Sequence, residues 1–338
     1  MYTLNINYKN NEKLCENLNF FYKGLLKTDN IHLKILLFNN NNKIFFESIF
    51  LKDCNYYIDS NNNDLNNDFR INYDLIYINE KNNINLFNYQ INIITSRFKF
   101  LKPGGIMIIE NIINNELDYI NKISHIKHNF SNFYFVNINN STKILILIRY
   151  GEKIFKNNKK MTIITPSIRP NNLLKIKDSI NFDYVNEWII VYDGSKILEN
   201  PNLFKNQNSK IKEYIYKGEG ISGNPQRNFA LDNIEIKDTY LYYLDDDNMI
   251  DINLYRLFDL LGDNFFYSFD QLNRINGNNI EIYQIDTAMV LIDYESCKDI
   301  RWILDKYNAD GYYIKDCYFR NKNNWIYINN SLCTYNVL

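Results

Sequence analysis

Tyr240-Leu-Tyr-Tyr-Leu-Asp-Asp-Asp-Asn248 is the most informative segment in the second half of this chain. Its aromatic and apolar residues are typical of a buried strand, and that strand runs directly into three carboxylates, Asp245, Asp246 and Asp247. Three adjacent negative charges repel one another unless a cation offsets them. Mg2+ and Mn2+ prefer hard oxygen ligands, and Mg2+ is usually held by one or two carboxylates together with substrate phosphates. We therefore expect a divalent metal, with Asp245 and Asp247 on one side of the strand and Asp246 on the other.

Two other interpretations of the three carboxylates are a calcium loop and a solvated acidic turn. An EF-hand loop starting at Asp245 needs Gly at its sixth position and Glu at its twelfth. Those positions hold Ile250 and Arg256, so an EF-hand is excluded. The solvated turn stays open.

A glycine-rich segment lies upstream of the acidic strand end, Gly218-Glu-Gly-Ile-Ser-Gly-Asn-Pro-Gln-Arg-Asn228. It contains the dinucleotide-binding spacing G-x-G-x-x-G after a predicted strand, Glu213–Lys217. Asn224 and Pro225, however, are typical of the N-cap and first residue of a helix, so the helix begins only after the third glycine. A ribose also needs one carboxylate, not three. We therefore favour a loop beside a diphosphate that Arg227 faces, the alternative being an ordinary surface arginine.

Two apolar strands precede this loop and begin the second domain. Met161–Thr165 ends in the polar turn Pro166–Pro170, and Glu187–Tyr192 ends at Asp193. Together, Ile-Thr-Pro-Ser at the first strand end, Val-Tyr-Asp-Gly at the second, the helix start Gly-Asn-Pro-Gln-Arg-Asn and the strand end Leu-Asp-Asp-Asp resemble a nucleotide-sugar glycosyltransferase of the GT-A fold. The resemblance is to family 2-like enzymes with a D-x-D motif and covers residues 161–338.

This resemblance implies a role for each matched position. Thr165, Pro166 and Asp193 would line the nucleoside pocket, and Asp247 would be the preferred metal ligand. The full set of implied substrate-binding residues is Thr165, Pro166, Arg169, Asp193, Gly223, Arg227, Asn228, Asp245, Asp246 and Asp286, and the implied metal ligands for Mn2+ or Mg2+ are Asp245 and Asp247. Asp286 would bind the transferred sugar or the acceptor, or else simply begin a strand.

The last part of the chain holds the candidate catalytic base. Phe265–Phe269 and Ile280–Ile285 are predicted strands joined by a turn containing Gly277. The segment after Trp302 resembles the one that carries the base in inverting enzymes, so Asp310 is the expected base and Asp316 the fallback. A solvated carboxylate at a helix start is the alternative for both, and retention of configuration stays open.

One feature departs from the family pattern. Many relatives supply a further metal ligand near the C-terminus, but the three histidines, His32, His125 and His128, all lie in the first half. Asn336 is the candidate replacement, unless the metal relies on Asp245, Asp247 and the diphosphate.

The first half reads as a second α/β domain. The strand Tyr73–Ile78, a helix over Asn83–Phe100 and the strand Leu101–Asn111 resemble the latter part of a class I S-adenosylmethionine-dependent methyltransferase, which has a Rossmann-like sheet. The expected glycine-rich turn after Leu33–Phe38 instead reads Asn39-Asn-Asn-Asn-Lys43. We therefore expect a degenerate domain that does not bind S-adenosylmethionine and serves in scaffolding, acceptor docking or dimerisation. Asp59 would be the ribose-binding carboxylate if a cofactor did bind.

Composition bounds the remaining possibilities. The chain of 338 residues predicts two domains, 1–152 and 160–338, separated by a polar, lysine-rich stretch. The 38 basic and 39 acidic residues nearly cancel, which disfavours a nucleic-acid partner. Five scattered cysteines predict free thiols and no zinc site, and no apolar run is long enough for a membrane span. A cytoplasmic protein is expected.

Three functions remain open from the sequence. The first is a metal-dependent glycosyltransferase acting on a nucleotide-sugar donor and a hydroxyl acceptor, either glycan or protein. The second is a bifunctional glycosyltransferase and methyltransferase. The third is a non-catalytic nucleotide-sugar-binding scaffold protein. A second subunit that completes the acceptor site, and hence a homo-oligomer, also stays open.

Overall fold

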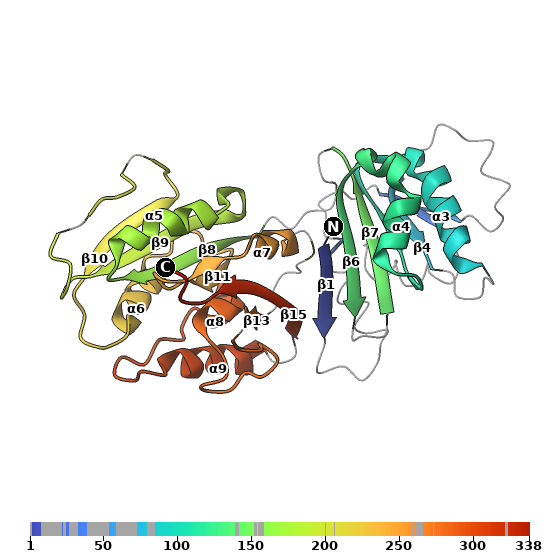
Figure 1. Cartoon of the computed structure of the whole chain (residues 1–338). Helices are drawn as coiled ribbons and strands as arrows, with labels where there is room; N and C mark the ends of the chain where they lie inside the picture. Colours follow the sequence, from blue (N-terminus) through green and yellow to red (C-terminus); the bar gives the residue numbers. More distant parts are fainter. Residues whose placement is uncertain are drawn as a thin grey trace. The chain divides into compact units, whose positions relative to one another are not determined.

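The computed structural model describes residues 2–7, 22, 25–26, 33–38, 54–58, 73–79, 85–138, 142–151, 154, 159–199, 201–205, 207–258, 260, 266–272, 274–321 and 324–338. The chain is a mixed α/β protein that divides into two compact units, one ending at residue 156 and the other continuing from residue 157 (Figure 1). This division lies in the interval between the two domains expected from the sequence.

The first unit contains a mainly parallel sheet in the order β1-β6-β7-β5-β4-β2-β3. Its strands are β1 Tyr2–Asn7, β2 Lys34–Leu37, β3 Asn55–Ile58, β4 Tyr73–Ile78, β5 Leu101–Ile109, β6 Phe130–Ile138 and β7 Thr142–Arg149, and its longer helices are α3 Leu86–Arg97 and α4 Glu116–Lys122. Only β7 runs antiparallel to its neighbours among these strands. Every residue of β4 is buried, which explains its almost continuous apolar sequence.

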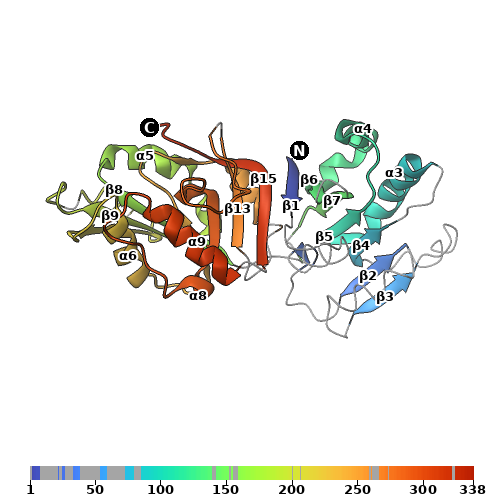
Figure 2. The ribbon, with the colours of Figure 1, turned by 90° about the horizontal axis from the view of Figure 1, so that it is seen from below.

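The helices α3 and α4 pack on one face of this sheet (Figure 2). The predicted helix over residues 83–100 corresponds to α3 and the 3₁₀ turn Phe98–Phe100. The turn Asn39–Lys43 and Asp59 lie outside the described residues. Failure to bind S-adenosylmethionine therefore stays a prediction.

The second unit has a mixed sheet in the order β10-β9-β8-β11-β14-β13-β15, with β12 paired to β15. Its strands are β8 Lys160–Ser167, β9 Val185–Asp193, β10 Ile211–Tyr216, β11 Thr239–Tyr243, β12 Met249–Ile250, β13 Phe266–Gln271, β14 Val290–Asp293 and β15 Trp325–Thr334; its helices are α5 Pro170–Ser179, α6 Asn224–Asp232, α7 Ile252–Leu257, α8 Tyr294–Cys297 and α9 Ala309–Asn321. Strands β8 to β11 are parallel, so the carboxyl ends of β8, β9 and β11 lie at one edge of the sheet. Such an edge is where open α/β sheets bind ligands.

Two local predictions in this unit were wrong. Residues 280–285 form a turn instead of a strand, because the Gln284 N–H donates to the Glu281 carbonyl at 2.9 Å and Tyr283 is left-handed, with φ 70°. The N-cap of α6 is Gly223, not Asn224. The Asn224 side chain donates instead to the carbonyls of Ile303 and Lys306, each at 3.0 Å, and so ties the helix start to the loop before α9.

Aromatic packing fixes the strand ends that carry the polar residues. Tyr243, the last residue of β11, is fully buried and packs edge-on against Trp302, and the Tyr243 hydroxyl donates to that of Tyr313 at 2.7 Å. Trp302 and Tyr313 also stack, with ring centroids 4.6 Å apart. These contacts hold the end of β11 in place, and the three aspartates follow directly after it.

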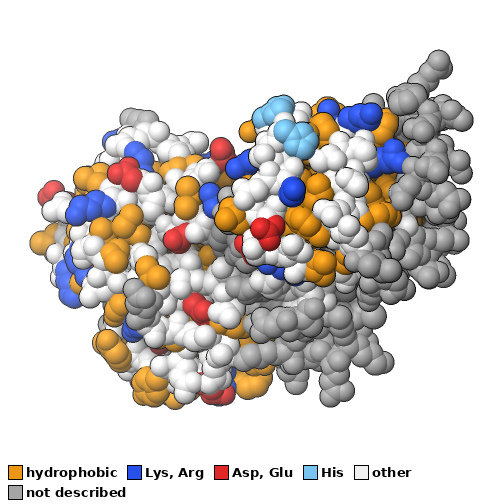
Figure 3. Space-filling view, turned by 45° about the vertical axis from the view of Figure 1, so that its right-hand side comes forward, with side chains coloured by type: hydrophobic (Ala, Val, Ile, Leu, Met, Phe, Trp, Pro, Cys, Tyr) orange, Lys and Arg blue, Asp and Glu red, His pale blue; other side chains and the backbone are white. Residues whose placement is uncertain are grey.

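On the face shown in Figure 3, basic and acidic side chains of the described residues are interspersed. In the described part of the chain, every helix is too short or too polar to cross a membrane.

Candidate functional site

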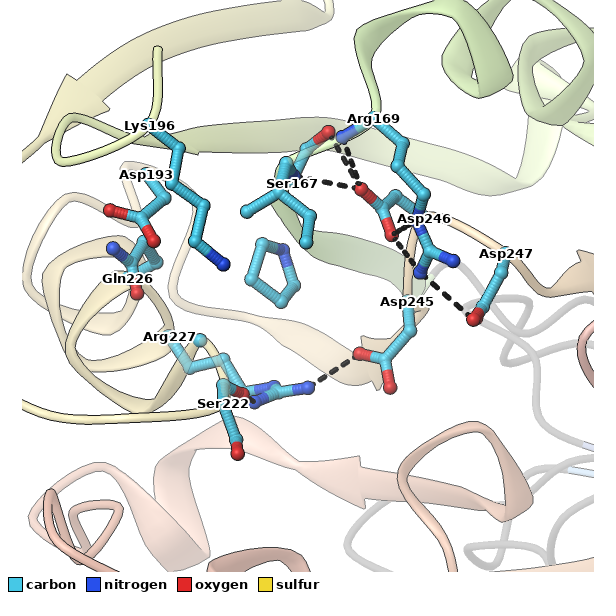
Figure 4. A pocket seen from close by; sticks show the side chains of 13 residues that line it. Ser167, Arg169, Asp193, Lys196, Ser222, Gln226, Arg227, Asp245, Asp246 and Asp247 are labelled. Carbon is cyan, nitrogen blue, oxygen red and sulfur yellow. Dashed lines mark hydrogen bonds and ion pairs between the residues drawn. The ribbon is translucent and has the colours of Figure 1, made fainter. Parts of the chain in front are cut away.

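A cleft of about 210 Å³, here called cleft 1, lies at the carboxyl edge of β8, β9 and β11 (Figure 4). It is lined by Pro166, Ser167, Ile168, Arg169, Asp193, Lys196, Ser222, Gly223, Gln226, Arg227, Asp245, Asp246 and Asp247. Most residues that the sequence assigned to the donor site therefore meet in one place.

Asp246 fixes the turn between β8 and α5. This buried carboxylate accepts hydrogen bonds from the backbone N–H groups of Ile168 and Arg169, both at 2.8 Å, and from the Ser167 hydroxyl at 3.1 Å. The Arg169 guanidinium also donates to Asp246 and continues to Asp247 at 2.8 Å. Asp246 lines cleft 1, but most of its acceptor capacity is used inside the protein.

The expected alternation of the three carboxylates was wrong. The strand β11 ends at Tyr243, and a turn closed by the Asn248 N–H and the Asp245 carbonyl at 3.1 Å follows. Figure 4 shows the consequence: Asp246 and Asp247 share Arg169, whereas Asp245 faces Arg227.

Arg227 is buried beneath the glycine-rich loop. Its guanidinium donates to the Ser222 carbonyl at 2.7 Å and to Asp245 at 2.5 Å, and it lies 4.5 Å from the centroid of the Trp302 ring. Its Nε–H has no hydrogen-bond partner among the described residues. The loop approaches this closely because Gly223 has φ 75° and a Cβ there would lie 2.7 Å from Pro166 Cβ.

Lys196 is a cation of cleft 1 that the sequence reasoning missed. It lies in the loop three residues after Asp193, is exposed, and extends into the cleft in Figure 4. Its amine has no hydrogen bond or ion pair within the part of the chain that the structure describes. Asp193 itself accepts from the N–H and hydroxyl of Ser195 at 2.9 and 2.6 Å, which shapes this loop. A lysine directly after a strand-end turn was the available sequence signal.

The carboxylates of cleft 1 are compatible with a divalent cation. One oxygen of Asp247 accepts from Arg169, and the other has no partner among the described residues. Three basic side chains already face four carboxylates in this cleft, so a diphosphate would add further unbalanced negative charge. Among the described residues, no group of three or more His, Cys, Asp or Glu side chains is arranged to hold a metal ion. A cation held by Asp247 and Asp245 would therefore need phosphate oxygens as further ligands, an arrangement that Mg2+ accepts.

A second cleft of about 250 Å³, here called cleft 2, shares Ser222, Arg227 and Asp245 with cleft 1. Its other lining residues are Asn224, Arg274, Ile275, Tyr283, Ile285, Asp286, Thr287, Trp302, Tyr307, Asn308, Asp310 and Tyr335. The two clefts therefore meet at the ion pair between Arg227 and Asp245.

Asp310 is the carboxyl group in cleft 2 that is suited to accept a proton. Burial raises its pKa to about 6, and the negative charges of Asp286 and Asp245 act in the same direction. The Gly311 N–H, which donates to Asp310 at 2.8 Å, and the charge of Arg227 partly oppose this rise. A carboxylate with a pKa near neutrality combines a useful ionised fraction with basicity.

Asp286 and Asp245 continue the polar wall of cleft 2. Asp286 is paired with Arg274 at 2.5 Å and accepts from the Thr287 hydroxyl at 3.1 Å, and that hydroxyl also lies 3.4 Å from Asp245. Burial raises the pKa of Asp245, and Asp286 adds to this, although Arg227 opposes it. Asp286 lies in the cleft as expected, whereas its partner Arg274 was missed because nothing in the local sequence indicates it.

Four predicted positions lie elsewhere. Thr165 is buried and its hydroxyl accepts from the Trp188 indole at 2.9 Å, so it packs the core beside the cleft residue Pro166. Asn228 is used inside the protein, because its side chain accepts from the Trp302 N–H at 2.8 Å and donates to the Trp302 carbonyl at 3.0 Å. Asp316 is exposed on α9 and Asn336 is exposed in the C-terminal segment, and neither lines cleft 1 or cleft 2.

Comparisons with known proteins find solved structures that are similar to this chain, but they do not assign it to a family. No protein-family model matches the sequence, and no curated protein matches it. Among solved structures, the chain is similar to residues 1–349 of S. aureus TarS, a glycosyltransferase, with 14% identity, a TM-score of 0.41 and coverage of 52% of this chain and 60% of that one. It is also similar to Haemonchus contortus phosphoethanolamine N-methyltransferase 2 in complex with S-adenosyl-L-methionine, with 11% identity, a TM-score of 0.27 and coverage of 68% and 65%. The chain thus spans less than two thirds of each, and likenesses this distant carry no assignment of activity.

Proposed function

We propose that the second unit is a glycosyltransferase that moves a sugar from a nucleoside-diphosphate donor to a hydroxyl acceptor. The observation that carries this proposal is the wall shared by the two clefts, which contains the ion pair between Arg227 and Asp245. Arg227 and Asp245 separate a cleft with three basic side chains from a cleft that contains a carboxyl group of raised pKa, Asp310. A reaction at this wall would have a phosphate leaving group on one side and a proton acceptor on the other.

The donor occupies cleft 1 in this proposal. Pro166 and Asp193 contact the nucleoside, and Lys196 and Arg227 contact the diphosphate, with Gly223 leaving room for its close approach. A divalent cation bound at Asp247 and Asp245 would supply positive charge beside the departing diphosphate.

The transfer step uses the residues on both sides of the shared wall. The Asp310 carboxylate accepts the proton of the acceptor hydroxyl, whose oxygen forms a bond to the anomeric carbon. The bond from that carbon to the diphosphate oxygen breaks, and its electron pair leaves with the nucleoside diphosphate. Arg227, already desolvated beneath Trp302, stabilises the charge that develops there. Attack opposite to the leaving group gives inversion.

The experiment is to measure release of nucleoside diphosphate from a panel of nucleotide sugars by the whole chain, with Mn2+ and with water or simple sugars as acceptors. We expect release from at least one donor by the wild type and a collapse of release in Asp310→Asn. Retained binding of that donor by the variant separates a catalytic from a binding defect. Undiminished release in Asp310→Asn would remove Asp310 from the mechanism, and binding without any release would favour a nucleotide-sugar-binding protein.

A further inference from the structure

Three tyrosine side chains on the lining of cleft 2 have no place in the chemistry described above. Tyr283 is 79% exposed, Tyr307 is 84% exposed and Tyr335 is 41% exposed. Large rings left in water around a cleft are available for stacking against a ligand, and a tyrosine provides an apolar face together with a polar tip.

Tyr283 is held in place at a conformational cost. Its φ of 70° lies in the left-handed region, which a bulky side chain adopts only when the surroundings impose it. The turn that carries it is fixed to α9: Glu281 forms an ion pair with Lys315 at 2.5 Å, and a Cβ at Gly311 would lie 2.8 Å from Ile282 Cα. Tyr283 follows Ile282, and Asp310 precedes Gly311. The close contact between Ile282 and Gly311 therefore holds the exposed ring and the proposed base near each other.

Tyr307 and Tyr335 are positioned by other contacts around the cleft. The carbonyl of Lys306, next to Tyr307, accepts from the Asn224 side chain at 3.0 Å, which ties this loop to the start of α6. The guanidinium carbon of Arg274 lies 3.5 Å from the centroid of the Tyr335 ring, so Arg274 covers one face of that ring, which is still 41% exposed. The three tyrosines are therefore set on supported segments.

The charges of cleft 2 select against an anionic ligand. Its lining contains two arginines and three aspartates, and each arginine is already paired, Arg227 with Asp245 and Arg274 with Asp286. The third aspartate, Asp310, adds negative charge when ionised. Cleft 1 has the additional exposed cation Lys196, whereas among the described residues that line cleft 2 no basic side chain lies outside these two ion pairs. An anion entering cleft 2 would therefore meet net negative charge with no further cation to offset it.

We propose that cleft 2 binds a neutral carbohydrate acceptor, stacked on a tyrosine platform made of Tyr283, Tyr307 and Tyr335. A sugar ring presents C–H groups on its faces, which suit aromatic rings, and hydroxyls at its edges, which suit Asn308 and Asp310. This inference rests on the proposed function, because it names the substrate of the acceptor side of the same site.

The test uses the full chain on a glycan array that carries neutral and acidic oligosaccharides in matched pairs, such as lactose and 3′-sialyllactose. The affinity of the best neutral glycan is then measured by titration calorimetry. We expect neutral members to bind better than their acidic partners. Tyr283→Ala and Tyr307→Ala should each weaken the binding of that glycan about tenfold. Tyr283→Phe keeps the ring, so its Kd should stay within about twofold of the wild-type value. Tyr150→Ala, an exposed tyrosine that lines neither cleft, is the matched control and should change nothing.

The outcomes separate this inference from the proposed function. The platform is overturned if the wild-type chain binds no neutral glycan or prefers acidic glycans, or if both alanine variants bind the neutral glycan as tightly as the wild type. Donor binding, measured by the thermal shift with a nucleotide sugar, should be the same in the tyrosine variants as in the wild type. If glycan binding behaves as expected while no nucleotide sugar binds, the carbohydrate site stands and the transferase proposal fails.

Discussion

Arg227 and Asp245 form an ion pair at 2.5 Å that is part of the lining of both clefts. Arg227 comes from the first turn of α6, and Asp245 comes from the chain just after β11. The glycine-rich loop and the acidic strand end, recognised separately in the sequence, therefore act at one point. This pairing puts the proposed leaving group and the proposed base on opposite sides of a single ion pair.

Replacing Asp310 with Asn should lower turnover and raise stability. Loss of a general base costs about 10²- to 10⁴-fold in rate. The raised pKa of Asp310, to about 6, means that ionisation of this group disfavours the folded state near neutral pH. Removing the charge should therefore stabilise the fold by up to about 3 kcal/mol, visible as a Tm several degrees higher at pH 7.5.

Asp316→Asn is the matched control for this substitution, since Asp316 is an exposed aspartate on the same helix. It should leave both turnover and Tm nearly unchanged. If Asp310→Asn melted at the wild-type temperature or below it, burial of the Asp310 charge would not destabilise the folded state.

The pH dependence of transfer should show an acidic limb set by Asp310. Only the ionised carboxylate accepts a proton, so kcat/KM should fall as the pH drops below about 6, the value to which burial raises this pKa. The sign for stability is opposite: the contribution of this group is fully present below its unfolded pKa and is lost as pH rises through about 6. A rate profile without an acidic limb near this pH would contradict the role of Asp310.

Arg227→Lys should weaken donor binding by tenfold or more, although the charge is kept. A lysine cannot bond to Ser222 and Asp245 at once in the same plane or lie flat on Trp302. Calorimetric titration with the best nucleotide sugar measures the change in Kd. Arg301→Lys, which alters a solvent-exposed ion pair with Asp232, is the control and should bind the donor normally. Equal affinities for the two variants would exclude Arg227 from donor binding.

Lys196→Met should weaken donor binding several-fold and leave the fold intact. Lys196 is exposed and has no partner within the described residues, so its removal should change the free energy of unfolding by less than about 0.5 kcal/mol. Because the lysine acts through its charge, the dependence of donor Kd on salt concentration should also become shallower. An unchanged salt dependence would show that Lys196 does not contact the phosphates.

The sequence predicted the parts of the site that depend on local geometry. Asp193 ends β9, Asp247 follows β11, and Gly223 precedes a helix start, and each of these local features can be recognised in the sequence. The roles of these residues came from the resemblance to known glycosyltransferases. Asp310, at the start of α9, was predicted differently, from the resemblance of the segment after Trp302 to the one that carries the base in inverting enzymes.

The rest of the site depends on contacts between distant segments. Thr165 and Pro166 are neighbours, but the alternation along β8 turns Thr165 toward Trp188 and leaves Pro166 at the cleft. Arg274, which follows β13, forms an ion pair with Asp286. Between these two residues the chain makes a turn in which Tyr283 is left-handed, where a strand was expected. Neither the facing partner of a strand residue nor the path of an irregular loop is encoded in local spacing.

We propose that cleft 1 binds a nucleoside-diphosphate sugar together with a divalent metal. The most direct measurement is the thermal shift of the full chain with a panel of nucleotide sugars at millimolar concentration, with Mn2+ and with chelator, alongside Asp247→Asn. A ligand at 100 times its Kd stabilises the native state by about 2.7 kcal/mol, which corresponds to several degrees. We expect such a shift with at least one donor, larger with Mn2+ and reduced in Asp247→Asn. No shift with any nucleotide sugar in the presence of Mn2+ would contradict it.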